Sequence, residues 1–329
     1  MTTTRSATIH IHRHGGPEVM EPAAVDVADP GPGQLRLRQT AIGLNYADIY
    51  EREGRHGPHS ANPFPITLGS LGAGVVTAVG PGVTAVAIGQ SVASLQSGAY
   101  QVERLVAASH VVALPPGIAE DVAAATLLRG LTAEYLLHRL YAVRPGDTVL
   151  VHASAGGMGS LLCPWARALG ATVIGTVGSA AKKAVALAHG CHHVIDYRAE
   201  DFVARTRELT EGRGVGVVYD AVGKDVFERS LDCLRPMGLL ISYGTASGDV
   251  GLFDLQRLHA KSLSVCRPTL RTFIGDPADL RRGAERFFDA ARAGDVRLAV
   301  DRRYALSDVR RAHEDLEGRG TTGAAILVP

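Results

Sequence analysis

The 329-residue sequence has little that would attract a nucleic acid or hold the chain in a membrane. Its 34 Lys and Arg residues almost balance 33 Asp and Glu residues, so the formal charge of +1 provides no broad field for a polyanion. No apolar run is long enough to span a bilayer, and Met1–Ser6 lacks the apolar segment of a signal peptide. We therefore expect a cytoplasmic protein whose partner is a small molecule.

Cysteine is also scarce, and its spacing excludes two kinds of site. The four cysteines are Cys163, Cys191, Cys233 and Cys266. None of them has the paired spacing of a disulfide framework or of a structural zinc site, so we interpret them as reduced thiols. Histidines gather at residues 10–14 and 189–193, which leaves adventitious metal binding open, although surface histidines explain them better. The sequence predicts no metal.

The chain changes character near Pro115-Pro116. Residues 5–98 contain short alternating runs broken by Gly and Pro, which predicts a mostly β structure. After the prolines, apolar helix faces alternate with short apolar strands, the pattern of a parallel sheet covered on both sides. The predicted strands are Thr148–His152, Thr172–Val177, His193–Ile195, Gly216–Asp220, Leu239–Tyr243 and Leu263–Cys266.

These patterns predict an α/β protein with two domains. We expect a mostly β domain at residues 1–125, a doubly wound parallel-sheet domain at 126–268, and a return to the first domain at 269–329. The apolar run Ala324–Val328 is the strand expected to rejoin the first domain. A cleft between two closely packed domains is the expected site.

A glycine-rich loop follows the first predicted strand of the second domain. Residues 153–159 read Ala-Ser-Ala-Gly-Gly-Met-Gly and lead into a helix with an apolar face. In this order, the glycines let the backbone approach a pyrophosphate at the helix N-terminus. Gly156 and Gly159 occupy the second and third glycine positions of the dinucleotide motif, whereas Ser154 replaces the first. The alternative is an ordinary tight turn between strand and helix.

The cofactor preference is expected at the end of the second strand of that domain. NAD-binding sites usually carry an acid there for the ribose 2′-hydroxyl, but residues 176–183 contain none. They offer instead a hydroxyl and the cations Lys182 and Lys183, which suit the 2′-phosphate of NADPH. We predict NADPH over NADH with Lys182 as the phosphate ligand; a solvated helix face is the alternative for both lysines.

Together these motifs resemble the zinc-independent quinone oxidoreductases, the ζ-crystallin-like branch of the medium-chain dehydrogenase/reductase superfamily. The likeness runs almost end to end. The residues that carry it are His14–Val19, Gly43–Asp48 with Tyr50, Gly130–Ala133, Ala153–Gly159, Val218–Gly223 and Arg267-Pro268.

The resemblance implies a GroES-like catalytic domain built from both chain ends, a Rossmann domain between them, bound NADPH, and commonly a homodimer. It places cofactor contacts on Asn45, Thr132, Gly157, Met158, Gly178, Ser179, Lys182 and Tyr197. Further implied contacts are Tyr243, Gly244, Ser247, Cys266, Pro268 and Arg319.

The chain departs from the family pattern at three places. Gly69-Ser70-Leu71 lacks a metal ligand and a carboxylate that relatives often carry, Pro164 replaces a common glutamine, and Arg129 stands where Lys or Gln is frequent. Zinc-dependent members of the superfamily have ligands at the positions of Asn45 and Ser70. Neither side chain offers zinc a thiolate or an imidazole, so the resemblance implies metal-independent chemistry here.

Without a metal to polarise a carbonyl, the acceptor must already be electrophilic, as quinones and conjugated enones are. We expect Asn45 to orient the cofactor or the acceptor, and Tyr50 to stack on a flat acceptor or relay a proton. Core packing is the alternative for Tyr50. An NADPH:quinone reductase is the predicted activity; the alternatives are an NADPH-dependent alkenal or enone reductase and a non-catalytic NADPH-binding protein.

Overall fold

The computed structural model describes residues 3–55, 63–318 and 323–329. The chain forms two compact units: Met1–Leu128 with Leu298–Pro329, and Arg129–Arg297. We call these the first and second units and describe each separately. No helix in the described ranges is both long enough and apolar enough to cross a membrane.

The first unit is built on two β-sheets. Its strands are β1 (Thr4–Ile11), β2 (Met20–Val27), β3 (Gln34–Leu44), β4 (Ile66–Thr67), β5 (Gly72–Val79), β6 (Ser91–Ser94), β7 (Glu103–Ala107), β8 (Val111–Ala113), β15 (Arg302–Ala305) and β16 (Ala325–Val328). A small sheet has the order β2-β1-β4, and a larger one has the order β15-β16-β3-β5-β6-β8, with β7 also paired to β3. β16 pairs antiparallel with β3, so the predicted return of the chain end is confirmed.

Alternation along β3 explains how the larger sheet obtains its core. Leu35 and Leu37 are fully buried, whereas Arg38, between the buried Leu37 and Gln39, faces solvent. Gly74 on β5 lies directly against this strand, since a Cβ at that residue would come within 2.0 Å of the Arg38 carbonyl oxygen. Glycine at this position therefore allows β5 to pack closely against β3.

Short helices complete the first unit. They are η1 (Pro17–Val19), α1 (Tyr46–Arg52), η3 (Ala108–His110), η6 (Leu306–Asp308) and α10 (Val309–Glu317). α1 follows directly after β3, so the long strand delivers its first residues to one end of the sheet. Val309 and Ala312 of α10 are buried in the same apolar cluster as Ile11 and Tyr100.

The second unit is a single parallel sheet covered by helices. Its strands are β9 (Thr148–Val151), β10 (Thr172–Val177), β11 (His193–Asp196), β12 (Val215–Asp220), β13 (Leu234–Ser242) and β14 (Ser264–Cys266). They lie in the order β11-β10-β9-β12-β13-β14, and every pairing is parallel. This is the doubly wound Rossmann arrangement, so the predicted fold of the domain is confirmed.

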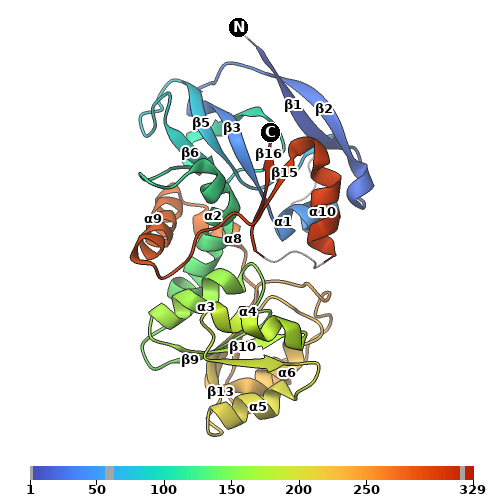
Figure 1. The fold of residues 1–329 in the computed structure, drawn as a ribbon, viewed down its shortest axis with the longest axis vertical. Coiled ribbons are helices and arrows are strands. Elements are labelled where there is room, and N and C mark those ends of the chain that lie inside the picture. The colour runs from blue at the N-terminus through green and yellow to red at the C-terminus, as the bar shows by residue number, and fades with distance from the viewer. Residues whose placement is uncertain (1–2, 56–62, 319–322) are drawn as a thin grey trace. The chain divides into compact units, whose positions relative to one another are not determined.

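Helices lie on both faces of that sheet. The helices of the second unit are α3 (Gly159–Ala168), η5 (Ala180–Lys182), α4 (Lys183–Ala188), α5 (Phe202–Leu209), α6 (Phe227–Cys233), α7 (Gln256–His259), α8 (Leu270–Ile274) and α9 (Pro277–Ala293). α2 (Glu120–Glu134) begins in the first unit and ends in the second, and η4 (Tyr135–Leu140) follows it. Figure 1 shows α3 and α4 on one side of β9 and β10, and α5 and α6 on the other. Phe202 and Phe227 pack with Leu150 and Val218 in the buried core on the second side.

The predicted return to the first domain at residue 269 differs from the observed division, which places it at Leu298. The reason is α9, which packs within the second unit. The ring of Phe287 fills the space beside Gly130, where a Cβ would come within 2.5 Å of it. Arg286 on the same helix forms an ion pair with the buried carboxylate of Glu134. These contacts hold 269–297 in the second unit.

Candidate active site

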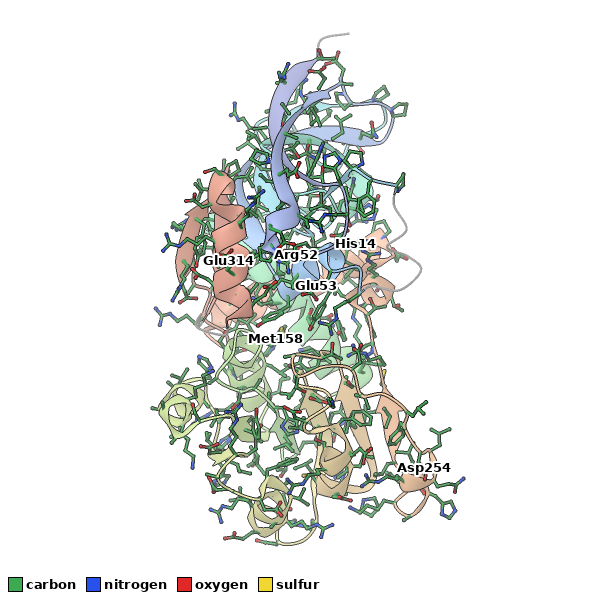
Figure 2. All side chains as sticks on the ribbon, turned by 90° about the vertical axis from the view of Figure 1, so that its right-hand side faces the viewer. His14, Arg52, Glu53, Met158, Asp254 and Glu314 are labelled. Carbon is green, nitrogen blue, oxygen red and sulfur yellow. The ribbon has the colours of Figure 1, made fainter. Side chains whose placement is uncertain are left out.

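The glycine loop of the second unit offers free backbone donors at the start of a helix. Gly157, Met158 and Gly159 use their backbone N–H groups in no hydrogen bond within the described ranges, and α3 begins at Gly159 with Met158 as its N-cap (Figure 2). Unpaired N–H groups at a helix N-terminus bind anions through the helix dipole. The predicted pyrophosphate position therefore has the donors that the motif requires.

Close packing explains why the third position of the dinucleotide motif is a glycine, Gly159. It also explains how Ser154 can replace the first glycine. A Cβ on Gly159 would lie 2.1 Å from the carbonyl oxygen of Ser154. Ser154 itself is buried, and its hydroxyl donates to the carbonyl oxygen of Thr176 at 3.0 Å. The serine thus links the loop to β10, while the positive φ of 53° falls on Ala153. The loop keeps its course without the first glycine.

Arg129 supports the same loop, which the sequence did not predict. Its Nη1 atom donates to the Gly157 carbonyl oxygen at 3.0 Å. This bond draws the carbonyl toward a cation and places a positive charge beside the loop's free N–H groups. A departure from the family pattern was the only signal in the sequence, and it did not reveal this contact.

The carboxyl end of β10 brings four predicted cofactor residues together. A Cβ on Gly178 would lie 3.1 Å from the hydroxyl of Tyr197, so the phenol covers that glycine, and Ser179 and Lys182 follow within the same turn. Lys183 binds Glu200 at 2.7 Å. Lys182 is exposed and forms no ion pair with any described residue. Of the two lysines, Lys182 has the uncommitted charge.

The segments at the carboxyl ends of β13 and β14 contain five further predicted contacts. These are Tyr243, Gly244 and Ser247 after β13, Cys266 at the end of β14, and Pro268 just beyond it. The Tyr243 hydroxyl is buried and has no hydrogen-bond partner within the described residues. The Ser247 hydroxyl donates to the Val222 carbonyl oxygen at 2.7 Å, which commits its proton to the loop.

Asp220 ends β12 at the same edge of the sheet. Its Oδ1 atom accepts from the backbone N–H groups of Val222 and Gly223, at 2.8 and 3.0 Å. Burial raises the pKa of the carboxyl to about 6, against the opposing effect of these two donors. These contacts are those of a residue that caps a turn.

In the first unit, Asn45 stands between β3 and α1. Its backbone N–H donates to Asp48 Oδ2 at 2.9 Å, a bond typical of a helix N-terminus. A Cβ on Gly43 would lie 3.2 Å from Asn45 Nδ2, so the amide rests over that glycine. Nδ2 is buried and, within the described residues, unpartnered. An unpaired buried donor costs free energy, which a ligand acceptor would recover.

Asp48 is fully buried and accepts two side-chain hydrogen bonds besides the one from Asn45. Ser70 Oγ donates to Oδ1 at 2.7 Å, and the Tyr100 hydroxyl donates to Oδ2 at 3.2 Å. Burial raises the pKa of this carboxyl to about 6, and hydrogen bonds from Ser70, Asn45 and Tyr100 oppose that rise. A serine in place of the usual metal ligand thus binds the carboxylate instead.

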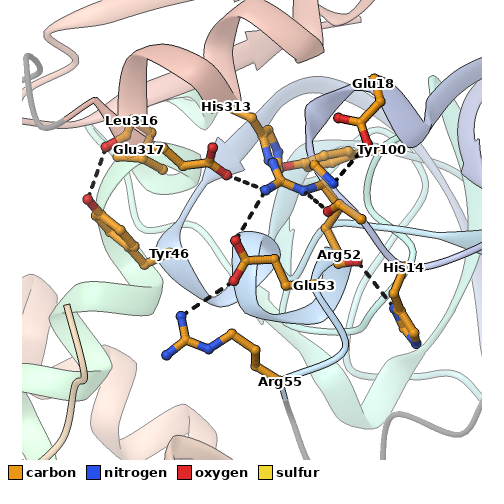
Figure 3. A network of polar contacts seen from close by, with 12 residues as sticks. His14, Glu18, Tyr46, Arg52, Glu53, Arg55, Tyr100, His313, Leu316 and Glu317 are labelled. Atoms are coloured by element: carbon orange, nitrogen blue, oxygen red, sulfur yellow. Dashed lines mark hydrogen bonds and ion pairs between the residues drawn. The ribbon is translucent and has the colours of Figure 1, made fainter. Parts of the chain in front are cut away.

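A larger polar network surrounds the end of α1 (Figure 3). Arg52 Nη1 lies 3.0 Å from His313 Nδ1, and His313 Nε2 lies 2.8 Å from the Tyr100 hydroxyl. Arg52 also forms an ion pair with Glu317 of α10 and contacts Glu53 at 3.5 Å. Figure 2 shows Arg52 and Glu53 beside α10. None of the long-range members had a signal in the sequence.

Tyr50 lies on α1, half-buried. The guanidinium carbon of Arg55 lies 4.7 Å from the centre of its ring, so a cation covers one face of the phenol. The ring of Tyr46 lies 6.3 Å away, tilted by 47°. These contacts do not distinguish stacking or proton transfer from core packing for Tyr50.

Thr132 and Arg319 are two further predicted cofactor residues. Thr132 lies half-buried on α2, and Arg319 falls outside the described residues. The described ranges contain no group of three or more His, Cys, Asp or Glu side chains that could hold a metal ion.

Comparison with known proteins identifies the chain. An alcohol dehydrogenase GroES-like domain model matches residues 31–139, and a zinc-binding dehydrogenase model matches residues 157–290. A quinone oxidoreductase of Pseudomonas aeruginosa is 45% identical over 324 residues, which cover 98% of this chain and 99% of that protein. The chain belongs to the quinone oxidoreductase family.

Other relatives and structures agree with this membership. Within the quinone oxidoreductase family, the crystal structure of the Escherichia coli enzyme complexed with NADPH superposes with a TM-score of 0.93 at 42% identity, covering 98% of this chain and all of that one. A 2-haloacrylate reductase of a Burkholderia species is 44% identical over 97% of this chain and 98% of its own. The expected GroES-like and Rossmann folds and the resemblance are confirmed.

Proposed function

We propose that this quinone oxidoreductase family member reduces quinones with NADPH and without a metal ion. The observation that carries the proposal is identity of 43–45% to quinone oxidoreductases over nearly the whole chain. Identity at that level extends through both units, so it includes the glycine loop and the Asn45 region together. NADPH, when bound, supplies the hydride.

The second unit has the donors for NADPH. The free N–H groups of Gly157, Met158 and Gly159 would hold the pyrophosphate, assisted by the charge of Arg129. Lys182, with Gly178, Ser179 and Tyr197, would bind the adenosine 2′-phosphate. The Tyr243 hydroxyl also supports NADPH binding by the second unit, because it is buried and has no hydrogen-bond partner among the described residues. Thr132, Gly156, Gly244, Ser247, Cys266, Pro268 and Arg319 remain proposed contacts on the basis of the resemblance.

Metal independence follows from the donor chemistry of two residues. At the positions where zinc-dependent members carry ligands, the chain has an amide at Asn45 and a hydroxyl at Ser70. The Ser70 hydroxyl donates to Asp48, and the Asn45 amide has a buried Nδ2 donor without a partner among the described residues. Neither group is a zinc ligand in ordinary protein sites.

In this mechanism Asn45 orients the reacting groups through its unpaired Nδ2 donor. The amide would hold a carbonyl or hydroxyl oxygen and so fix the distance over which hydride moves. Tyr50 would stack on the flat acceptor or pass a proton to the reduced oxygen. Tyr50→Phe separates these roles, because unchanged turnover across pH would leave stacking alone.

Reduction of conjugated enones is the second candidate, and one relative favours it. The 2-haloacrylate reductase acts, by its name, on a conjugated alkene, and its identity to this chain equals that of the quinone oxidoreductases. Both reactions deliver hydride to a conjugated acceptor that is already electrophilic, so the same residues would serve them. Only the shape of the acceptor pocket would differ.

Steady-state rates with NADPH decide between the candidates. We expect kcat/KM for 1,4-benzoquinone or a naphthoquinone to exceed that for 2-chloroacrylate and for an α,β-unsaturated ketone by at least about tenfold, since about 1.4 kcal/mol of differential transition-state binding is needed for that ratio. A higher value for the alkenes would reverse the assignment. Tight NADPH binding with no turnover of either class would favour a non-catalytic role.

We also propose a homodimer in the cytoplasm. β14 is an outer strand of the parallel sheet with no partner beyond it in the described chain, and Leu252 and Leu255 nearby are strongly exposed. An open strand edge with apolar neighbours suits pairing with a second copy. Sedimentation velocity should give the mass of two chains, reduced to one by Leu252→Asp; a monomeric wild type would exclude the dimer. Cell fractionation tests the location, which rests on the sequence alone.

A further inference from the structure

The protons in the network around α1 have only one consistent arrangement. A guanidinium has donors and no acceptor, so Arg52 Nη1 donates to His313 Nδ1. His313 is buried, and burial with the charge of Arg52 lowers its pKa to about 3. The neutral ring therefore carries its proton on Nε2, which donates to the Tyr100 oxygen. The single phenol proton of Tyr100 is then available to Asp48.

Asp48 is the end of this chain of donors. Its carboxylate accepts hydrogen bonds from the Tyr100 and Ser70 hydroxyls and from the backbone N–H of Asn45. In all three contacts the partner is the donor and Asp48 is the acceptor, so each bond favours the ionised carboxylate. Bonds to an ionised acceptor are about twice as strong as those between neutral groups.

We propose that Arg52, His313 and Tyr100 are positioning residues for catalysis: they hold Asp48 as an ionised acceptor, and Asp48 in turn holds Asn45 in its working orientation. We call Arg52, His313, Tyr100 and Asp48 the Asp48 relay. The inference rests on the proposed role of Asn45 and extends it to His313, a residue of α10 far away in the sequence.

The Asp48 relay is connected directly to Asn45, so its loss should change the orientation of Asn45 and not only the stability of the fold. Asn45 has its own backbone N–H bound to Asp48 and its Nδ2 free for a ligand. A carboxylate that loses one donor shifts or protonates, and the Asn45 N–H is the bond that then weakens. The amide stands three residues before Asp48 on the same chain, so its orientation changes with that bond.

The groups that face the relay come from three parts of the first unit. Glu51, Arg52 and Glu53 belong to the end of α1, His313 and Glu317 to α10, and Ser70 and Tyr100 to the connecting segments. Arg52 is already matched by Glu317 and Glu53. Loss of the Tyr100 donor would therefore raise the pKa of Asp48 above its value of about 6, because a bond that favours the charged form is removed.

Tyr100→Phe tests the relay with the smallest change in shape. We expect kcat for quinone reduction to fall about tenfold, the dissociation constant of NADPH to stay within about threefold, and the acid limb of the kcat profile to move upward by roughly one pH unit. His313→Gln, which retains a donor near the Nε2 position, should keep more activity than His313→Leu. Equal losses in the two His313 variants would overturn the inference.

Tyr219→Phe is the matched control. Tyr219 is a buried tyrosine of the second unit whose hydroxyl donates to the Leu136 carbonyl oxygen at 3.3 Å, so the change removes the same atom from a hydroxyl bound to a backbone carbonyl rather than to a carboxylate. Its pH profile should match that of the wild type. The same upward movement of the acid limb in Tyr219→Phe would show that any buried phenol produces it and would overturn the relay.

A double-mutant cycle identifies the residue through which Tyr100 acts. In an Asn45→Ala background, Tyr100→Phe should change kcat by less than about twofold, because the group it positions is already absent. Additive losses would mean that Tyr100 acts elsewhere, and the inference would fail.

The Asn45 backbone amide gives a readout that needs no turnover. Its NMR signal should titrate with Asp48 near pH 6 in the wild type and at higher pH in Tyr100→Phe. If the quinone activity fails but this shift appears, the relay stands and the proposed function is wrong. If activity is present and the amide titrates identically in both proteins, the relay is wrong.

Discussion

Lys182→Glu is expected to raise the dissociation constant of NADPH about 30-fold and to leave that of NADH within about threefold. Loss of one charge-assisted hydrogen bond to the 2′-phosphate accounts for roughly 2 kcal/mol, which is about 30-fold in affinity. The lysine is exposed and in no ion pair with a described residue, so its removal should cost little stability. A fluorescence titration with both cofactors measures the change.

Lys183→Glu is the control, because it makes the same change in charge one residue further along the chain. The Lys183 ammonium is bound to Glu200, so it has less to offer a phosphate. Its NADPH preference should survive. An equal loss in both variants would assign the preference to net charge in this region rather than to Lys182, and equal binding of both cofactors by the wild type would contradict the choice of NADPH.

Gly159→Ala should destabilise the protein itself, even without cofactor. The new Cβ would lie 2.1 Å from the Ser154 carbonyl oxygen and 2.7 Å from its Cα, so backbone must move to admit it. Overpacking of this kind costs about 2 kcal/mol, equivalent to a fall of about 5 °C in Tm for a unit of this size. Thermal unfolding of the cofactor-free protein, followed by circular dichroism, measures it.

Gly156→Ala gives the complementary result at the neighbouring glycine. Its Cβ would meet only the Ala153 carbonyl oxygen, at 3.1 Å, so the unfolding temperature should fall by no more than about 2 °C. The methyl would stand where the backbone should approach the pyrophosphate, and NADPH affinity should fall instead. If Gly159→Ala melted like the wild type, the packing account of the third glycine would be wrong.

The order of elements in the second unit could be predicted because its signals are local. Short apolar strands separated by helical patterns indicate a parallel sheet, and the glycine loop must follow the first strand for the helix N-terminus to meet a phosphate. The choice of Lys182 over Lys183 was also made from the sequence. The contact that separates them, between Lys183 and Glu200, agrees with that choice.

The end of the second unit could not be predicted in the same way. The charged, amphipathic helix α9 has an apolar face that could cover either unit, and its pattern does not say which. Packing of Phe287 beside Gly130 and pairing of Arg286 with Glu134 decide it, across more than 150 residues of chain.

The sequence by itself determined the two fold types, the cofactor loop and the residues next to each strand end, because periodicity and motif spacing are properties of neighbouring residues. Only the tertiary structure decided the surroundings of Asn45. Ser70 and Tyr100 contact Asp48 from separate segments, and His313 contacts Tyr100 from a third; each is an ordinary polar residue in its own stretch of sequence. Burial of a carboxylate demands such partners, but which residues supply them depends on how distant strands and helices pack.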